Sequence, residues 1–128
     1  MNNIEKIYLH SLISRKTEVK VIKILFVCSR SRWRSLTAEK TFNGKNIYEF
    51  RSAGTEENTR IKITAGHIGW SDLILVMEKK HHTRIQQRFN DEEKGKKIIR
   101  LDIPDEYEFM DEELIDLLES RVSEHIEI

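Results

Sequence analysis

Cysteine, proline and glycine are all scarce in this chain of 128 residues, which contains one cysteine, one proline and five glycines. A single cysteine excludes an intramolecular disulfide and any zinc site that is built from several cysteines. The length fits one domain of ordinary size, whose core needs neither a disulfide nor a metal to stabilise it. We therefore expect a single globular domain with a free thiol.

The sequence also lacks net charge and long apolar runs. Lys plus Arg and Asp plus Glu both number 22, so the formal net charge is zero. This leaves no global field to attract nucleic acid or an anionic membrane. No stretch approaches the roughly 20 apolar residues that span a bilayer, and the N-terminus does not resemble a secretory signal. We expect a cytoplasmic protein that binds neither nucleic acid nor a membrane, and whose thiol stays reduced.

Short apolar runs alternate with segments of helical pattern from residue 21 onward. Strands, of the kind that is buried in a parallel sheet, are predicted over residues 21–28, 47–51, 72–77 and 97–101. Helices are predicted over residues 35–43, 64–69, 79–89 and 111–122, with Ser35 and Asp111 as the N-caps of the first and the last. The alternation indicates an α/β fold with a mostly parallel sheet and helices on both faces. Residues 1–20 differ in pattern, and we interpret them as an arm appended to a domain of residues 21–128.

Polar and reactive side chains gather where these predicted strands end. Cys28 ends the first strand, residues 52–55 (SAGT) follow the second, Glu78 follows the third and residues 102–110 follow the fourth. Ligands of open α/β sheets bind at the carboxyl ends of the strands. The sequence therefore predicts a site at that edge of the sheet.

Five residues separate Cys28 from Arg34 in the segment "CSRSRWRS" (28–35). A loop between a strand and a helix points its N–H groups into one concavity, and the helix N-terminus adds partial positive charge. Such surroundings favour a thiolate, which is a nucleophile, and the planar guanidinium of arginine matches two oxygens of a phosphate. The spacing indicates a thiolate that attacks a bound phosphoryl group.

The run "ILFVC" with Arg34-Ser35 and the following Ala-Glu resembles the active-site loop of the low-molecular-weight protein tyrosine phosphatases. The resemblance continues in "SAGT", "SDLILVME" (71–78) and "IPDEY" (103–107), and it covers about residues 22–125. The segments "VMEKKH" and "LDIPD" resemble a compact bacterial branch of that family. The resemblance implies a three-layer sandwich with a four-stranded parallel sheet in the order 2-1-3-4, which is a phosphatase-I or flavodoxin-like fold.

The same resemblance implies a metal-independent tyrosine phosphatase that uses no cofactor. It would hydrolyse phosphotyrosine proteins or aryl phosphates through a phosphocysteine intermediate. Cys28 would be the nucleophile, Arg34 would bind the phosphoryl oxygens, and Asp105 would be the general acid, with Asp102 as the alternative. The resemblance assigns further substrate contacts to Ser29, Arg30, Ser31, Arg32, Trp33, Ser35 and Tyr107, and the Ser35 hydroxyl would stabilise the thiolate.

Several positions depart from the family pattern. The family usually has Gly and Asn where this chain has Arg30 and Ser31, and the Asn supports a left-handed backbone kink. Arg30 and Arg32 add positive charge at the mouth of the loop, which favours acidic or multiply phosphorylated substrates. Glu106 replaces a family proline, and the connection after "SAGT" is short. We expect Trp33 to pack in the core rather than to wall the pocket.

Other functions fit parts of the pattern. A phosphate-binding or phosphotyrosine-binding module with an impaired loop follows from the changes at Arg30 and Ser31. An arsenate reductase shares the Cys-x5-Arg loop but would need an external thiol here, because the chain has no second cysteine. A sugar-transport phosphocarrier also places a phosphorylated cysteine after its first strand, but it does not require Arg34. The pair His81-His82 is predicted to lie on a solvated helix face.

Overall fold

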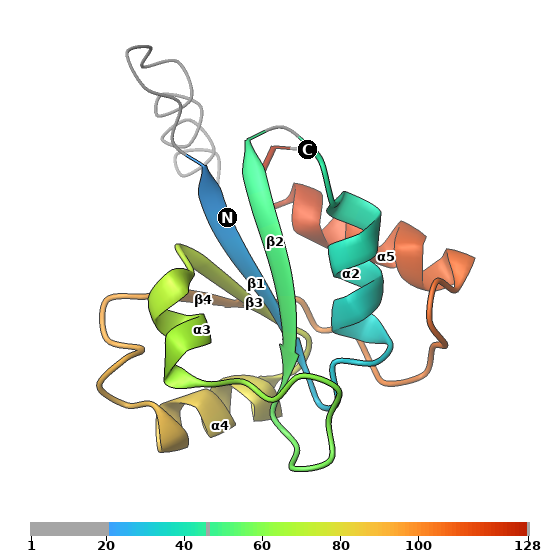
Figure 1. The fold of residues 1–128 in the computed structure, drawn as a ribbon. Helices are drawn as coiled ribbons and strands as arrows, with labels where there is room; N and C mark the ends of the chain where they lie inside the picture. The colour runs from blue at the N-terminus through green and yellow to red at the C-terminus, as the bar shows by residue number, and fades with distance from the viewer. Residues whose placement is uncertain (1–20, 46, 128) are drawn as a thin grey trace, which may run out of the picture.

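The computed structural model describes residues 21–45 and 47–127, and it confirms the predicted alternation of strands and helices (Figure 1). The strands are β1 (Ile22–Cys28), β2 (Tyr48–Gly54), β3 (Leu73–Val76) and β4 (Lys97–Arg100). The helices are α2 (Arg34–Phe42), α3 (Ala65–Trp70), α4 (Lys79–Arg88) and α5 (Glu112–Ser123). The arm predicted for residues 1–20 lies outside the described residues.

The four strands form one parallel sheet in the order β2-β1-β3-β4, as the resemblance implied. The central strand β1 pairs with β2 along its whole length, from Ile22 opposite Tyr48 to Cys28 opposite Gly54. Residues 24–27 of β1 are fully buried, because helices cover both faces of the sheet. This burial explains why the strand is a continuous apolar run rather than an alternating one. Strand β2 extends three residues beyond its predicted end, through the "SAG" segment.

Figure 1 shows helices α2 and α5 on one face of the sheet and α3 and α4 on the other. Two core clusters correspond to these layers. Phe26 and Phe42 belong to the cluster under α2 and α5, and their rings stack with centroids 5.9 Å apart. Leu25 and Ile85 belong to the cluster under α3 and α4. The molecule is therefore the expected three-layer sandwich, and alternate residues of β1 face opposite layers.

Because all the strands are parallel, their carboxyl ends meet at one edge of the sheet. Backbone hydrogen bonds continue past the strand ends: Met77 N–H donates to Val27 O at 2.9 Å, and Ile103 N–H donates to Met77 O at 2.8 Å. The loops after β1, β3 and β4 therefore start side by side. Among the helices of the described part of the chain, none is long and apolar enough to cross a membrane.

Candidate active site

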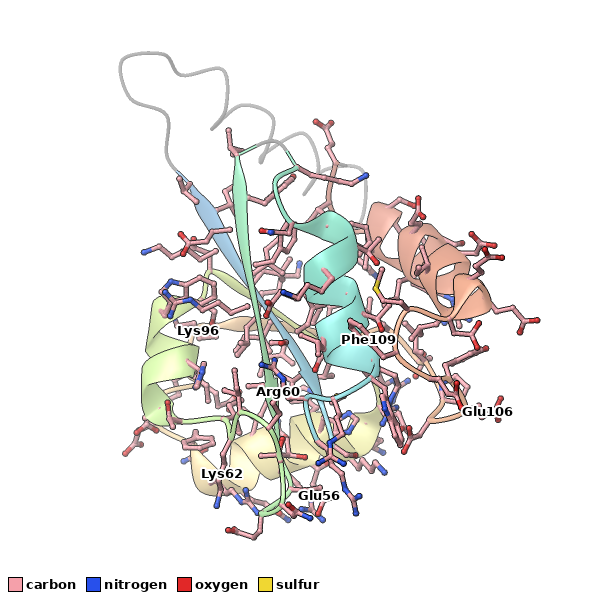
Figure 2. All side chains as sticks on the ribbon, turned by 45° about the vertical axis from the view of Figure 1, so that its right-hand side comes forward. Glu56, Arg60, Lys62, Lys96, Glu106 and Phe109 are labelled. Carbon is pink, nitrogen blue, oxygen red and sulfur yellow. The ribbon has the colours of Figure 1, made fainter. Side chains whose placement is uncertain are left out.

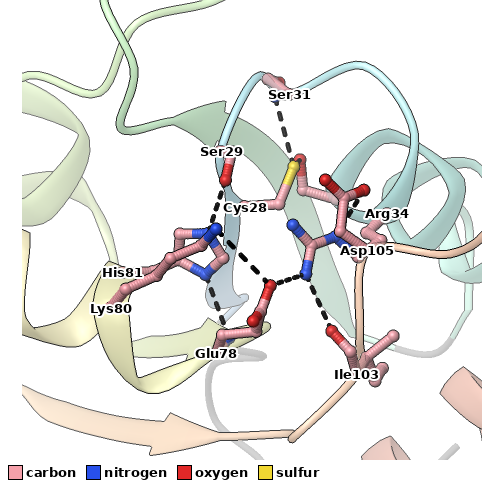
Figure 3. Close-up of polar contacts among 10 residues, drawn as sticks. Cys28, Ser29, Ser31, Arg34, Glu78, Lys80, His81, Ile103 and Asp105 are labelled. Atoms are coloured by element: carbon pink, nitrogen blue, oxygen red, sulfur yellow. Dashed lines mark hydrogen bonds and ion pairs between the residues drawn. The ribbon is translucent and has the colours of Figure 1, made fainter.

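Residues 28–34 form a loop around the buried thiol of Cys28 (Figure 3). The sulfur accepts the Ser31 backbone N–H at 3.3 Å and lies 3.0 Å from Ser35 Oγ. A thiolate would accept both hydrogen bonds, which stabilises the ionised form. The predicted N-cap role of Ser35 is wrong: Trp33 is the N-cap of α2 and makes no side-chain cap bond. Ser35 lies inside the helix, where its hydroxyl contacts the thiol instead.

The loop contains a left-handed kink at Ser31, whose φ is 53°. An L-residue adopts this conformation only when its surroundings hold it there. Arg60 supplies that support: its Nε donates to Ser31 O at 2.8 Å, and its Nη2 donates to Ser31 Oγ at 3.3 Å and to Ser52 Oγ at 3.0 Å. The sequence alone does not predict this role of Arg60, because no local pattern marks the contact.

The β2–α3 loop, which carries Glu56 and Arg60 in Figure 2, lies against the loop of residues 28–34. Its backbone N–H groups donate to three successive carbonyls: Thr55 to Cys28 O at 3.0 Å, Glu56 to Ser29 O at 2.8 Å, and Arg60 to Arg30 O at 3.1 Å. Gly54 makes this approach possible. A Cβ at Gly54 would lie 2.2 Å from Thr59 Oγ1 and 2.7 Å from Ser29 O.

Arg34 is almost fully buried, with 2% of its surface exposed. Its Nη1 forms an ion pair with Glu78 and donates to Ile103 O at 2.8 Å, and its Nε lies 3.7 Å from Asp105 Oδ1 (Figure 3). A buried charge requires such partners, and together they fix the orientation of the guanidinium. Sequence reasoning noted Glu78 only as a strand-end residue, and the structure makes it the anchor of Arg34.

The two candidate acids occupy different places. Asp105 is half-exposed and lines the same pocket as Cys28. Asp102 pairs with Arg100, with 2.7 Å between Oδ1 and Nε, and does not line the pocket. Tyr107 does not line it either; its half-buried side chain packs against the core cluster under α2 and α5. Of these three residues, only Asp105 is brought together with the thiol.

The pocket is open and has a volume of about 390 Å³. Its lining includes four cationic and two acidic side chains, so it suits an anion; the lining residues are Cys28, Ser29, Arg30, Arg32, Trp33, Arg34, Glu56, Lys80 and Asp105. Trp33 is 43% exposed, so the expectation that it packs in the core is wrong and it walls the pocket instead. Within the described part of the chain, no group of three or more His, Cys, Asp or Glu side chains is arranged to hold a metal ion.

The prediction of a solvated face is wrong for His81, which is fully buried. Its Nδ1 accepts the Glu78 backbone N–H at 3.0 Å, and its Nε2 lies 3.1 Å from Ser29 Oγ (Figure 3). Burial, helped by the nearby positive charge of Arg34, lowers the pKa of His81 to about 3. The ring is therefore neutral at ordinary pH. The next residue in the sequence, His82, is only half-buried.

This sheet order, with a cysteine loop after the central strand, is the fold of the low-molecular-weight phosphatases that the resemblance implied. Solved structures with the same fold include the YwlE arginine phosphatase of Geobacillus stearothermophilus (TM-score 0.64, 23% identity, covering 80% of this chain and 91% of that one). They also include the tyrosine phosphatase AmsI of Erwinia amylovora (TM-score 0.66, 22% identity, covering 85% and 93%). A third is the tyrosine phosphatase Wzb of Escherichia coli K30 in complex with phosphate (TM-score 0.60, 20% identity, covering 81% and 95%).

No family model and no curated protein matches the sequence. At these identities the likeness establishes the fold. The fold alone does not determine the chemistry, which depends on the side chains of this chain.

Proposed function

We propose that this protein is a cysteine-dependent phosphatase that hydrolyses phosphotyrosine-type phosphomonoesters through a phosphocysteine intermediate. The observation that carries the proposal is the convergence of Cys28, Arg34 and Asp105 on one open pocket, where the sulfur accepts the Ser31 N–H and lies within hydrogen-bond distance of Ser35 Oγ. The likeness to solved phosphatases, one of them in complex with phosphate, supports a phosphoryl-binding role for the pocket. A free thiol of this kind fits the reducing cytoplasm.

In the first step the Cys28 thiolate attacks phosphorus in line with the leaving phenolate. The S–P bond forms while the P–O bond breaks, and Asp105 gives its proton to the phenolate oxygen. The loop N–H groups and the Arg34 guanidinium bind the equatorial oxygens, on which charge is concentrated. The ion pair with Glu78 keeps that guanidinium in one orientation.

In the second step a water molecule attacks the phosphorus of phosphocysteine. Asp105, now ionised, accepts a proton from the water, the S–P bond breaks, and inorganic phosphate leaves. The Ser31 N–H and the Ser35 hydroxyl stabilise the thiolate that departs. Both steps use groups that already line or contact the pocket.

The rim of the pocket favours phosphotyrosine over phosphoarginine. Trp33 presents an exposed ring on which a phenyl ring can stack. The side chains of Arg30 and Arg32 are exposed and make no hydrogen bond or ion pair with another described residue. Their charge, with that of Lys80, would repel the guanidinium of a phosphoarginine and attract acidic flanking residues.

The first experiment measures p-nitrophenyl phosphate hydrolysis from pH 4.5 to 8, with EDTA present, for wild type and Cys28→Ser. We expect EDTA-resistant turnover by the wild type and none by the variant, because a hydroxyl is a far weaker nucleophile than a thiolate. Phosphotyrosine and phosphoarginine peptides are then compared, and we expect faster release of phosphate from phosphotyrosine, most of all beside acidic residues.

Three outcomes would contradict the proposal. Absence of turnover, with phosphate or vanadate still raising the thermal stability, would indicate a binding module. Turnover that survives Cys28→Ser would exclude a phosphocysteine. Arsenate reduction with an added thiol, in the absence of phosphatase activity, would favour a reductase.

A further inference from the structure

A buried histidine that neither proposed step uses lies directly behind the loop of residues 28–34. His81 is the third residue of α4, and no part of its side chain reaches solvent. Figure 3 shows its ring between the Glu78 backbone and the Ser29 side chain. Ser29 is one of the pocket-lining residues, so the ring contacts the binding site through a single hydroxyl.

The hydrogen bonds of the ring determine its tautomer. A backbone N–H can only donate, so Nδ1, which lies 3.0 Å from the Glu78 nitrogen, is an acceptor without a hydrogen. The ring is neutral, because burial first and then the charges of Arg34, Lys80 and Arg84 lower its pKa to about 3. Its one hydrogen is therefore on Nε2, which donates to Ser29 Oγ at 3.1 Å.

A serine hydroxyl that accepts a hydrogen bond keeps its own hydrogen for a second partner. Within the described part of the chain, His81 is the only side chain hydrogen-bonded to Ser29 Oγ. Ser29 is one of the residues that line the pocket. Its hydroxyl hydrogen is therefore available to an anion that the pocket holds.

We propose that His81 is a positioning residue that turns the Ser29 hydroxyl toward the pocket, where it donates a hydrogen bond to an oxygen of the bound phosphoryl group. This inference rests on the proposed phosphatase function, and it adds a side-chain donor to the loop amides and Arg34. The β3–α4 junction would then orient two groups of the site at once, Arg34 through the Glu78 carboxylate and Ser29 through His81.

The test combines Ser29→Ala, His81→Leu, the double variant and His81→Gln. Each is assayed for kcat and KM on p-nitrophenyl phosphate and for the Kd of inorganic phosphate. A hydrogen bond to a charged group corresponds to about a 10- to 100-fold change, so Ser29→Ala and His81→Leu should each weaken phosphate binding by about tenfold or more. The double variant should be no worse than the poorer single one, because His81 acts on phosphate only through the Ser29 hydroxyl. His81→Gln, whose amide can still donate, should recover most of the loss.

Additive losses, or a glutamine variant as poor as the leucine variant, would overturn the proposal and leave His81 as packing alone. Thermal stability measured on all four variants separates unfolding from weak binding.

If His81→Leu does not fold, the wild-type protein still provides a test. Nitrogen-15 NMR, with the His81 signals assigned by their loss in His81→Gln, should show the Nε2–H tautomer and no titration from pH 5 to 8. An Nδ1–H tautomer would contradict the inference.

The two proposals can fail separately. Phosphate binding by calorimetry needs no turnover, so a protein that binds phosphate without hydrolysing p-nitrophenyl phosphate would refute the phosphatase and still report the Ser29–His81 coupling. Normal hydrolysis with uncoupled variants would refute only the role of His81.

Discussion

The loop that carries Cys28 and the loop that carries Asp105 face the same pocket but are held differently. Residues 28–34 are bonded from two sides, by the N–H groups of the β2–α3 loop and by the β3–α4 junction. The β4–α5 loop, labelled at Glu106 and Phe109 in Figure 2, is exposed at residues 104–106. It is anchored on either side of that stretch, where Ile103 N–H donates to Met77 O and Met110 N–H donates to Thr37 Oγ1.

This contrast matches the two tasks that the proposed mechanism assigns to these loops. Donors that bind a phosphoryl group act best when they are fixed in advance, so the loop around the thiol needs many hydrogen bonds. A general acid has to reach the leaving oxygen, whose position differs from one substrate to the next. Glu106 stands where the resemblance predicts a proline, and a residue other than proline leaves the backbone φ angle unconstrained by a ring.

The largest expected effect comes from removing the proposed general acid, Asp105, while the loop of residues 28–34 stays intact. Asp105→Asn keeps the size of the side chain but cannot transfer a proton. We expect kcat on phenyl phosphate, which has a poor leaving group, to fall by about 10²- to 10⁴-fold. The fall on 2,4-dinitrophenyl phosphate should be much smaller, because that phenolate leaves without a proton.

Asp102→Asn is the matched control for this experiment. Asp102 has a φ of 56°, which asparagine tolerates well, and its carboxylate pairs with Arg100 outside the pocket. We expect Asp102→Asn to leave both rates near those of the wild type. A leaving-group effect in Asp102→Asn rather than in Asp105→Asn would reverse the assignment of the acid.

A smaller effect, on both stability and activity, should follow from a substitution at Gly54, where the β2–α3 loop packs against residues 28–34. The added Cβ of Gly54→Ala would fall within 2.8 Å of atoms in Thr59, Ser29 and Arg30, so the two loops must separate. Overpacking of this kind costs about 1–3 kcal/mol, which would lower Tm by roughly 5 °C or more. We also expect kcat/KM on p-nitrophenyl phosphate to fall by about tenfold, because the backbone N–H groups of residues 28–34 would no longer point at the phosphoryl oxygens.

Gly69→Ala is the control for Gly54→Ala, because a Cβ at Gly69 in α3 would meet nothing within 4 Å. Alanine is the better helix former, so Gly69→Ala should leave Tm unchanged or raise it slightly. Equal behaviour of the two variants would mean that the close approach at Gly54 does not hold the loop of residues 28–34.

The local pattern of the sequence was sufficient for the parallel strands and for the edge of the sheet at which the candidate site lies, whereas the strand order came from the resemblance. Buried parallel strands are apolar runs, and the run before Cys28 is fully enclosed by helices in the structure. Parallel strands bring their carboxyl ends together, so the loops after them could be predicted to meet. Asp111 was predicted correctly as an N-cap, since its carboxylate accepts the Glu113 N–H at 2.9 Å.

The supports of the site could not be predicted in the same way, because they depend on contacts between distant segments. His81 bonds a serine 52 residues earlier, and Arg60 bonds Ser31, which is 29 residues earlier. Nothing in "KKHH" or "ENTRIK" marks which side chain turns inward. Trp33 was misplaced for a related reason: large aromatic residues favour cores, but here the ring lies at a helix N-cap beside an open pocket.

The smallest expected effect concerns Arg60, which supports the kink without touching the thiol. Arg60→Met removes the hydrogen bonds to Ser31 and Ser52 but keeps a side chain of similar length. The close approach at Gly54 and the backbone hydrogen bonds of the β2–α3 loop remain in this variant. The loop of residues 28–34 should therefore keep its fold, with Ser31 less stable in its left-handed conformation. We expect KM on p-nitrophenyl phosphate to rise roughly threefold to tenfold with little change in kcat, because only part of the energy of the three lost hydrogen bonds, about 1 kcal/mol each, bears on the conformation of the loop. Lys62→Met removes the exposed ion pair with Glu57 from the same segment and should change KM little. Equal effects of the two substitutions would show that the kink at Ser31 needs no support from Arg60.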